Sequence, residues 1–144
     1  MSNEDIQWSD EYTTGINAID SQHEDIIKSV NALYKALEEN AGKETIIELI
    51  EKLDNYTTKH FDTEEKYMKI YNYPEYAAQV RAHEFFKTIY NEIRYHSHYL
   101  TGDKYMHVYQ FALHLNQILI DWLRIHLETL DKVFAAFLKD KLTQ

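Results

Sequence analysis

The spacing of apolar side chains limits this chain to a helical fold. Apolar residues recur at intervals of three and four, which is the period of an amphipathic helix. Four long segments share the pattern, at about residues 19–39, 44–73, 75–99 and 104–126, and a shorter one contains Val133, Phe134, Phe137 and Leu138. Only three glycines and one proline are available for tight turns. The sequence therefore predicts an all-α fold, an antiparallel up-down-up-down four-helix bundle with a short C-terminal helix.

Short breaks separate the predicted helices. Ala41 and Gly42 follow the first, and Pro74 ends the second because proline disfavours a helical conformation in the residue before it. The run Thr101-Gly102-Asp103 precedes the fourth. The 144 residues fall within the usual size of one domain, and we find no repeat or linker. We expect a single domain over residues 1–144.

Composition excludes several classes of partner. The chain has 24 acidic against 15 basic residues, a formal charge of −9, which argues against nucleic acid or an anionic membrane surface. No apolar run approaches the ~20 residues needed to span a bilayer. The acidic start MSNEDIQWSD does not resemble an export signal, and the absence of cysteine is compatible with a reducing compartment. We expect a cytoplasmic protein, and its oligomeric state stays open.

Ionisable residues interrupt the apolar faces, and each of the four long segments carries at least one. They are His23, His60, Glu64, His83, His126 and, just past the fourth segment, Asp131. Buried charges must be paired or bind a metal to offset desolvation. Imidazole and carboxylate ligands suit iron, manganese or zinc, and no thiolate is available. The sequence therefore predicts a metal site between the helices.

The spacing of these residues favours two metal ions over one. His60 and Glu64 are one turn apart and project from the same helix face. His126 and Asp131 are five residues apart, or ~140° around an ideal helix, so they share a face only if the helix ends or loosens between them. A carboxylate released by such a break, together with Glu64, could bridge two metals.

The other histidines lack this context. His96, His98, His107 and His114 have no carboxylate or histidine partner within an apolar stripe. We interpret them as ordinary polar residues.

The motifs carry a family resemblance that covers most of the chain. It begins at Trp8 and at GINAIDSQHEDII, continues with HFDTEEKYM and the tetrapeptide YPEY, and closes with DWLRIHLETLDK. The patterns H-x3-E and WL-x2-H-x4-D, in this order, are specific. In these features the chain resembles the bacteriohemerythrins, single-domain bacterial relatives of the hemerythrin oxygen carriers.

This resemblance implies a non-haem di-iron centre that binds dioxygen reversibly. Two iron ions would be bridged by Glu64 and Asp131. The iron with an open coordination position would take the histidines of the first two helices, His23 and His60. The other iron would take those of the third and fourth helices.

One position departs from the family, whose third helix normally supplies H-x3-H. Counted from YPEY, the first position is Gln79 and the second is His83. If His83 is taken as the first, the second is Lys87, whose ammonium is a poor ligand. His114 lies twelve residues before His126, ~18 Å along the helix, and does not substitute easily. Gln79 either coordinates through its amide oxygen or leaves a water or an open position.

Apolar neighbours of these residues favour binding over turnover. They are Ile26 and Ile27 beside His23, Phe61 beside His60, and Trp122, Leu123 and Leu127 around His126. Such a wall restricts water and protons, and no separate general acid or nucleophile is evident in it. We expect a protein for oxygen carriage, storage or delivery. The alternatives are a peroxidase-like or nitric-oxide-handling enzyme, and an oxygen-sensing or iron-handling module.

Overall fold

A computed structural model describes residues 6–98, 100 and 106–143, and within these residues it contains helices and no strand. The elements are the 3-10 helix η1 (Asp10–Tyr12), α1 (Asn17–Glu38), α2 (Lys43–Ile70), α3 (Tyr76–Ser97), α4 (Met106–Glu128) and α5 (Leu130–Leu142). The predicted all-α class is confirmed. None of the described helices is long and apolar enough to cross a membrane.

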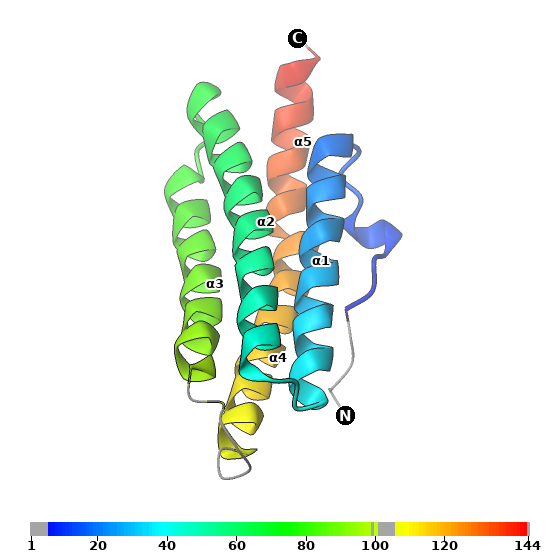
Figure 1. Ribbon diagram of the computed structural model, residues 1–144. Helices are drawn as coiled ribbons and strands as arrows, with labels where there is room; N and C mark the ends of the chain where they lie inside the picture. The colour runs from blue at the N-terminus through cyan, green and yellow to red at the C-terminus, as the bar shows by residue number, and fades with distance from the viewer. Residues whose placement is uncertain (1–5, 99, 101–105, 144) are drawn as a thin grey trace.

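The four long helices form the predicted bundle. Helix α1 packs against α2 and α4, and α3 packs against the same two neighbours. Successive helices run in opposite directions around a shared core, and α5 continues beyond the end of α4 towards the C-terminus (Figure 1). This arrangement turns one face of each long helix towards the common interior.

Two asparagines set the ends of α1 and α2. Asn40 and Asn72 have left-handed backbone conformations, with φ of 55° and 53°. After each of them, the next backbone N–H donates back to a carbonyl five residues earlier, at 2.9 Å and 2.8 Å. Asparagine tolerates this conformation and closes the last helical turn. The first helix therefore ends before the predicted Ala41-Gly42 break, and the second ends before Pro74 as predicted.

The break between α3 and α4 is only partly described. Helix α3 ends at Ser97, and α4 is described from Met106. The predicted Thr101-Gly102-Asp103 break and the predicted start of the fourth helix at Lys104 lie outside the described residues.

The apolar core consists of two clusters. The larger contains residues from α1, α2, α3 and α4 and extends along most of the bundle. The smaller consists of Ile19, Met68, Tyr73, Phe134 and Leu138, at the end of the bundle where α5 begins. All six predicted ionisable residues are buried. On α1, on α2 and at the junction of α4 and α5, residues of the larger cluster lie on one side of them along the chain and residues of the smaller cluster on the other.

We expect the bundle to fold without a metal ion, because both apolar clusters are formed by side chains outside the ionisable set. Removal of bound metal with a chelator should leave the far-ultraviolet circular dichroism of a helical protein. The melting temperature should fall, since an ion that binds only the folded state stabilises it according to its affinity and concentration. An unfolded metal-free chain would contradict this expectation.

Candidate metal centre

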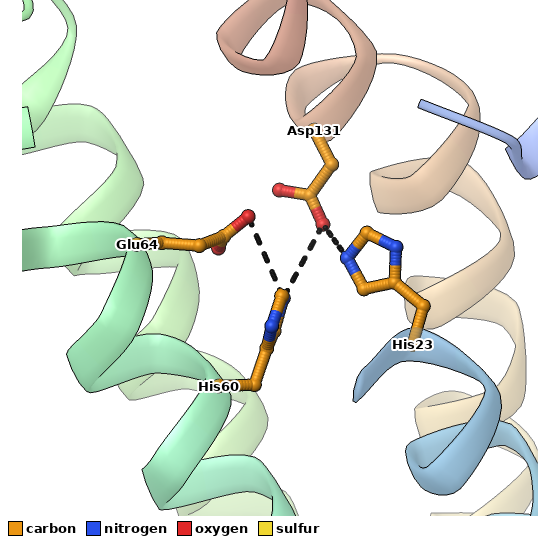
Figure 2. Close-up of side chains that lie close together, drawn as sticks. All are labelled: His23, His60, Glu64 and Asp131. Carbon is orange, nitrogen blue, oxygen red and sulfur yellow. Dashed lines mark ion pairs between the residues drawn. The ribbon is translucent and has the colours of Figure 1, made fainter. Parts of the chain in front are cut away.

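The structure brings the six predicted residues together in the bundle core. Two groups of candidate ligand atoms, each within 4.8 Å of one another, share the Glu64 carboxylate. The first group is His23, His60, Glu64 and Asp131, and the second is Glu64, His83 and His126. Figure 2 shows the four side chains of the first group converging from α1, α2 and α5. The second group adds His83 from α3 and His126 from α4, so residues that are remote in sequence meet where the five helices approach one another.

Glu64 faces both groups. Its Oε2 lies 3.4 Å from Nε2 of His60, one turn earlier on α2. Its other oxygen, Oε1, lies 3.1 Å from Nε2 of His83 on α3. The two oxygens of one carboxylate therefore point to histidines of different groups, which is the arrangement that a bridging ligand requires.

Asp131 also has one oxygen on each side. Its Oδ2 lies 2.9 Å from Nε2 of His23 and 4.0 Å from Nε2 of His60, and its Oδ1 lies 2.9 Å from Nε2 of His126. This geometry depends on a break between α4 and α5 at Thr129, whose φ of −120° and ψ of −80° are not helical. The predicted interruption between His126 and Asp131 is confirmed. The break lets the carboxylate turn back towards the bundle.

Several buried polar atoms in this cluster have no hydrogen-bond partner. They are Nε2 of His23, His60 and His126, Oε2 of Glu64, Oδ1 of Asp131 and Oε1 of Gln79. Some of them lie close to one another without hydrogen-bonding geometry, such as Nε2 of His126 and Oδ1 of Asp131 at 2.9 Å. Leaving such atoms unsatisfied costs about 1–3 kcal/mol each. These nitrogen and oxygen atoms, and their lack of hydrogen-bond partners, fit a bound cation.

The electrostatics of the centre favour positive charge. Burial alone would lower the pKa of His60, but the charges of Glu64 and Asp131 outweigh it and raise that pKa to about 10. Burial likewise opposes the raised pKa of His126, which the Asp131 carboxylate causes. Burial would raise the pKa of Asp131, yet His126 and its other imidazole neighbours hold it well below the usual value. The carboxylates therefore stay charged, and a metal ion would replace protons on the imidazoles.

Two further side chains orient the histidines. Nδ1–H of His60 donates to Oε1 of Gln22 at 2.8 Å, and Nδ1–H of His83 donates to Oε2 of Glu65 at 2.7 Å. Because each histidine donates from Nδ1 to a neighbouring side chain, Nε2 is the ring nitrogen that would bind a metal ion. Neither residue was predicted from the sequence. Each lies next to a predicted ligand in the sequence but contacts the histidine of a neighbouring helix, so the helix packing reveals it and the spacing does not.

Aromatic rings cover one side of the centre. Phe61 stacks on His83 with ring centroids 3.8 Å apart and planes 7° apart, and Trp122 stacks on His126 at 4.3 Å and 13°. Phe86 contacts the Phe61 and Trp122 rings. The histidine immediately before Phe61, expected to be its neighbour, has its ring centroid 5.9 Å away. The closer partner of Phe61 is therefore the imidazole on α3.

The structure also distinguishes the two ways of reading α3. Gln79 and His83 are both buried, one turn apart, whereas Lys87 is partly exposed. The register counted from YPEY therefore gives the inward-facing pair. The Gln79 amide nitrogen donates to the backbone carbonyl of Leu130 at 3.3 Å.

The remaining histidines lie away from the centre. His98, His107 and His114 are exposed, and His96 is partly buried against the ring of Phe111. Among the described residues, none of these four belongs to a group that could hold a metal. Their interpretation as ordinary polar residues agrees with this placement.

Comparisons with known proteins agree with this architecture. Residues 14–138 match the model of the hemerythrin HHE cation binding domain. A bacteriohemerythrin of Stenotrophomonas maltophilia is 31% identical over 139 residues, which cover 96% of this chain and 85% of the relative. Bacteriohemerythrins of Pseudomonas paraeruginosa and Pseudomonas aeruginosa are each 40% identical over 83 residues, 56% of this chain and 52% of theirs. The chain belongs to the hemerythrin family.

Proposed function

We propose that this protein holds two iron ions between Glu64 and Asp131 and binds dioxygen reversibly. The observation that carries the proposal is that each carboxylate directs one oxygen to each group of histidines. The bound iron would supply the electrons and the open coordination position that dioxygen uptake and release require. Membership of a cation-binding family supports this assignment, as does the nitrogen and oxygen donor set.

The protein would hold each iron with two histidines and one oxygen from each carboxylate. His23 and His60 share one side with Oε2 of Glu64 and Oδ2 of Asp131. The histidines of α3 and α4 share the other side with the remaining two oxygens. Gln22 and Glu65 fix the orientation of one histidine on each side.

The surroundings of the centre support binding over turnover. The buried side chains of Ile26, Phe61, Leu123 and Leu127, near the ligands on their helices, restrict access of water and protons. In the part of the chain that the structure describes, the buried histidine and carboxylate side chains are the six of the centre itself, and the other buried ionisable groups are tyrosines. No buried carboxylic acid or imidazole is left over to donate a proton to a bound substrate. Release of unchanged dioxygen is the outcome that such a site favours.

We expect the iron-loaded, reduced protein to develop a visible absorption band when oxygen is added and to lose the band when oxygen is removed. Repeated cycles should regenerate the same spectra, and elemental analysis should give two iron ions per chain. Rapid bleaching with consumption of peroxide would contradict oxygen carriage and indicate an enzyme. One iron per fully loaded chain would contradict the dinuclear assignment.

Removal of a bridging carboxylate should abolish dinuclear loading, because each contributes a ligand to both metals. We expect Glu64→Ala and Asp131→Ala to bind at most one iron ion per chain. His107→Ala, which removes an exposed imidazole outside the centre, is the control and should bind two. Metal analysis after anaerobic loading measures the difference. If both carboxylate variants load two irons as tightly as the parent, the bridging roles are wrong.

Loss of Glu65 should weaken metal binding without removing a ligand. Glu65→Ala deletes the acceptor that orients His83, and loss of such a partner commonly costs about 10–100-fold in affinity. Glu84→Ala deletes an exposed glutamate next to His83 in sequence and controls for the change in charge. Competition with a chelator of known affinity compares the two variants. Equal affinities would show that Glu65 has no orienting role.

A further inference from the structure

Gln79 is a buried polar side chain beside the centre that the six-residue set leaves out. Its Nε2 donates to the carbonyl oxygen of Leu130 at 3.3 Å, while its Oε1 is buried and has no hydrogen-bond partner. A backbone carbonyl only accepts hydrogen bonds, so the nitrogen end of the amide must face Leu130. The oxygen end is therefore held in place and available.

The position of this amide relates it to two residues of the centre. Gln79 lies four residues before His83, so the two side chains project from the same face of α3. Its hydrogen-bond acceptor, Leu130, immediately precedes Asp131 on α5. The amide is thus fixed between α3 and the start of α5, the two segments that bring His83 and Asp131 to the site.

Asn116 shows that an unsatisfied amide oxygen alone does not mark a ligand. It is also buried, its Nδ2 donates to the carbonyl of Val30 at 3.3 Å, and its Oδ1 has no partner. Asn116 lies ten residues before His126 on α4, ~15 Å along the helix, and so is remote from the centre. What distinguishes Gln79 is its place one turn from His83.

The candidate ligands are less closely grouped on the His83 side of the centre. Three residues form that group, against four around His23 and His60, and Asp131 approaches it only through Oδ1 beside His126. A neutral amide oxygen would add a donor there without adding charge to a core that already holds two carboxylates. Carbonyl oxygens suit manganese, and non-haem iron(II) sites combine imidazole nitrogens with oxygen donors.

We propose that Oε1 of Gln79 is a ligand of the metal ion held by His83 and His126. The proposal rests on the proposed function, because it assumes a metal on that side of the centre. Since an amide oxygen donates less strongly than an imidazole, this ion would be bound less tightly than by a histidine at position 79, and more tightly than without the amide. Gln79 therefore determines the affinity of one metal position and leaves the other unchanged.

The test compares three variants by anaerobic titration with iron(II) against a competing chelator, with thermal melting of each metal-free protein. Gln79→Leu keeps the size of the side chain and removes its oxygen, and Gln79→His supplies a stronger donor. Asn116→Leu is the matched control, because it removes an amide with the same kind of hydrogen bond far from the centre. All three substitutions change a buried polar group, so the melting curves measure any general effect on the fold.

We expect the parent to bind two iron ions. Gln79→Leu should weaken one of the two binding steps by about tenfold or more and leave the other step unchanged, a loss on the scale seen when the environment of a metal site is disturbed. Gln79→His should strengthen that same step. For Asn116→Leu, any shift in the melting temperature of the metal-free protein measures the general effect on the fold, and both iron affinities should match the parent.

Parent-like affinities for both irons in Gln79→Leu and Gln79→His would overturn the proposal and make Gln79 a purely structural residue. If Gln79→Leu does not fold, Gln79→His decides alone, because two unchanged binding steps contradict ligation and one strengthened step supports it. A parent protein that binds fewer than two irons overturns the proposed function and this inference together. That outcome is visible in the parent titration and is distinct from the failure of Gln79 alone.

Discussion

The pairing of buried imidazoles with buried carboxylates is the interaction on which the centre of this bundle depends. Isolated charges are costly in an apolar core, and Glu64 and Asp131 are almost completely buried. Their charges are balanced by histidines from neighbouring helices, which raises the pKa of His60 and lowers that of Asp131. The positive imidazoles stabilise the buried carboxylates when no metal is bound. The same carboxylates would also attract a metal cation, which would replace the protons on the imidazoles as it binds.

The helices bring the two carboxylates into this layer in two different ways. Glu64 and His60 need only the regular pitch of α2, whereas Asp131 needs the helix to stop at Thr129 and start again. The two carboxylates therefore reach equivalent roles by different routes. One uses an unbroken turn, and the other uses a break that redirects the chain towards the bundle axis.

Much of the fold and the set of centre residues could be predicted from the sequence, because both depend on the regular spacing of side chains along a helix. Apolar stripes defined the four long helices, and the five-residue spacing of His126 and Asp131 required an interruption that the structure contains. The helix ends were less predictable, since Asn40 and Asn72 act through a left-handed conformation that composition does not specify. Boundaries there depend on local hydrogen bonds and not on a repeating pattern.

The contacts around the ligands could not be predicted, because they are made across helices. Glu65 orients His83 on the neighbouring helix, and Phe61 stacks on the same ring. Sequence spacing gives the direction of a side chain from its own helix, but the relative rotation of two helices decides which side chain it meets. The neighbours of each centre residue therefore depend on how the helices pack against one another.

The break at Thr129 has a consequence for the dynamics of the C-terminus. Helix α5 carries Asp131 into the charged layer and Phe134 and Leu138 into the smaller apolar cluster, so its docking and the integrity of the centre are linked. Local opening of α5 would withdraw the Asp131 carboxylate from the centre, and a metal ion bound there would oppose that opening by the free energy of binding. Metal occupancy and amide hydrogen-exchange protection of the last helix are then two measures of one equilibrium. Docking of the C-terminal helix would complete the metal centre, and a bound ion would in turn keep that helix docked.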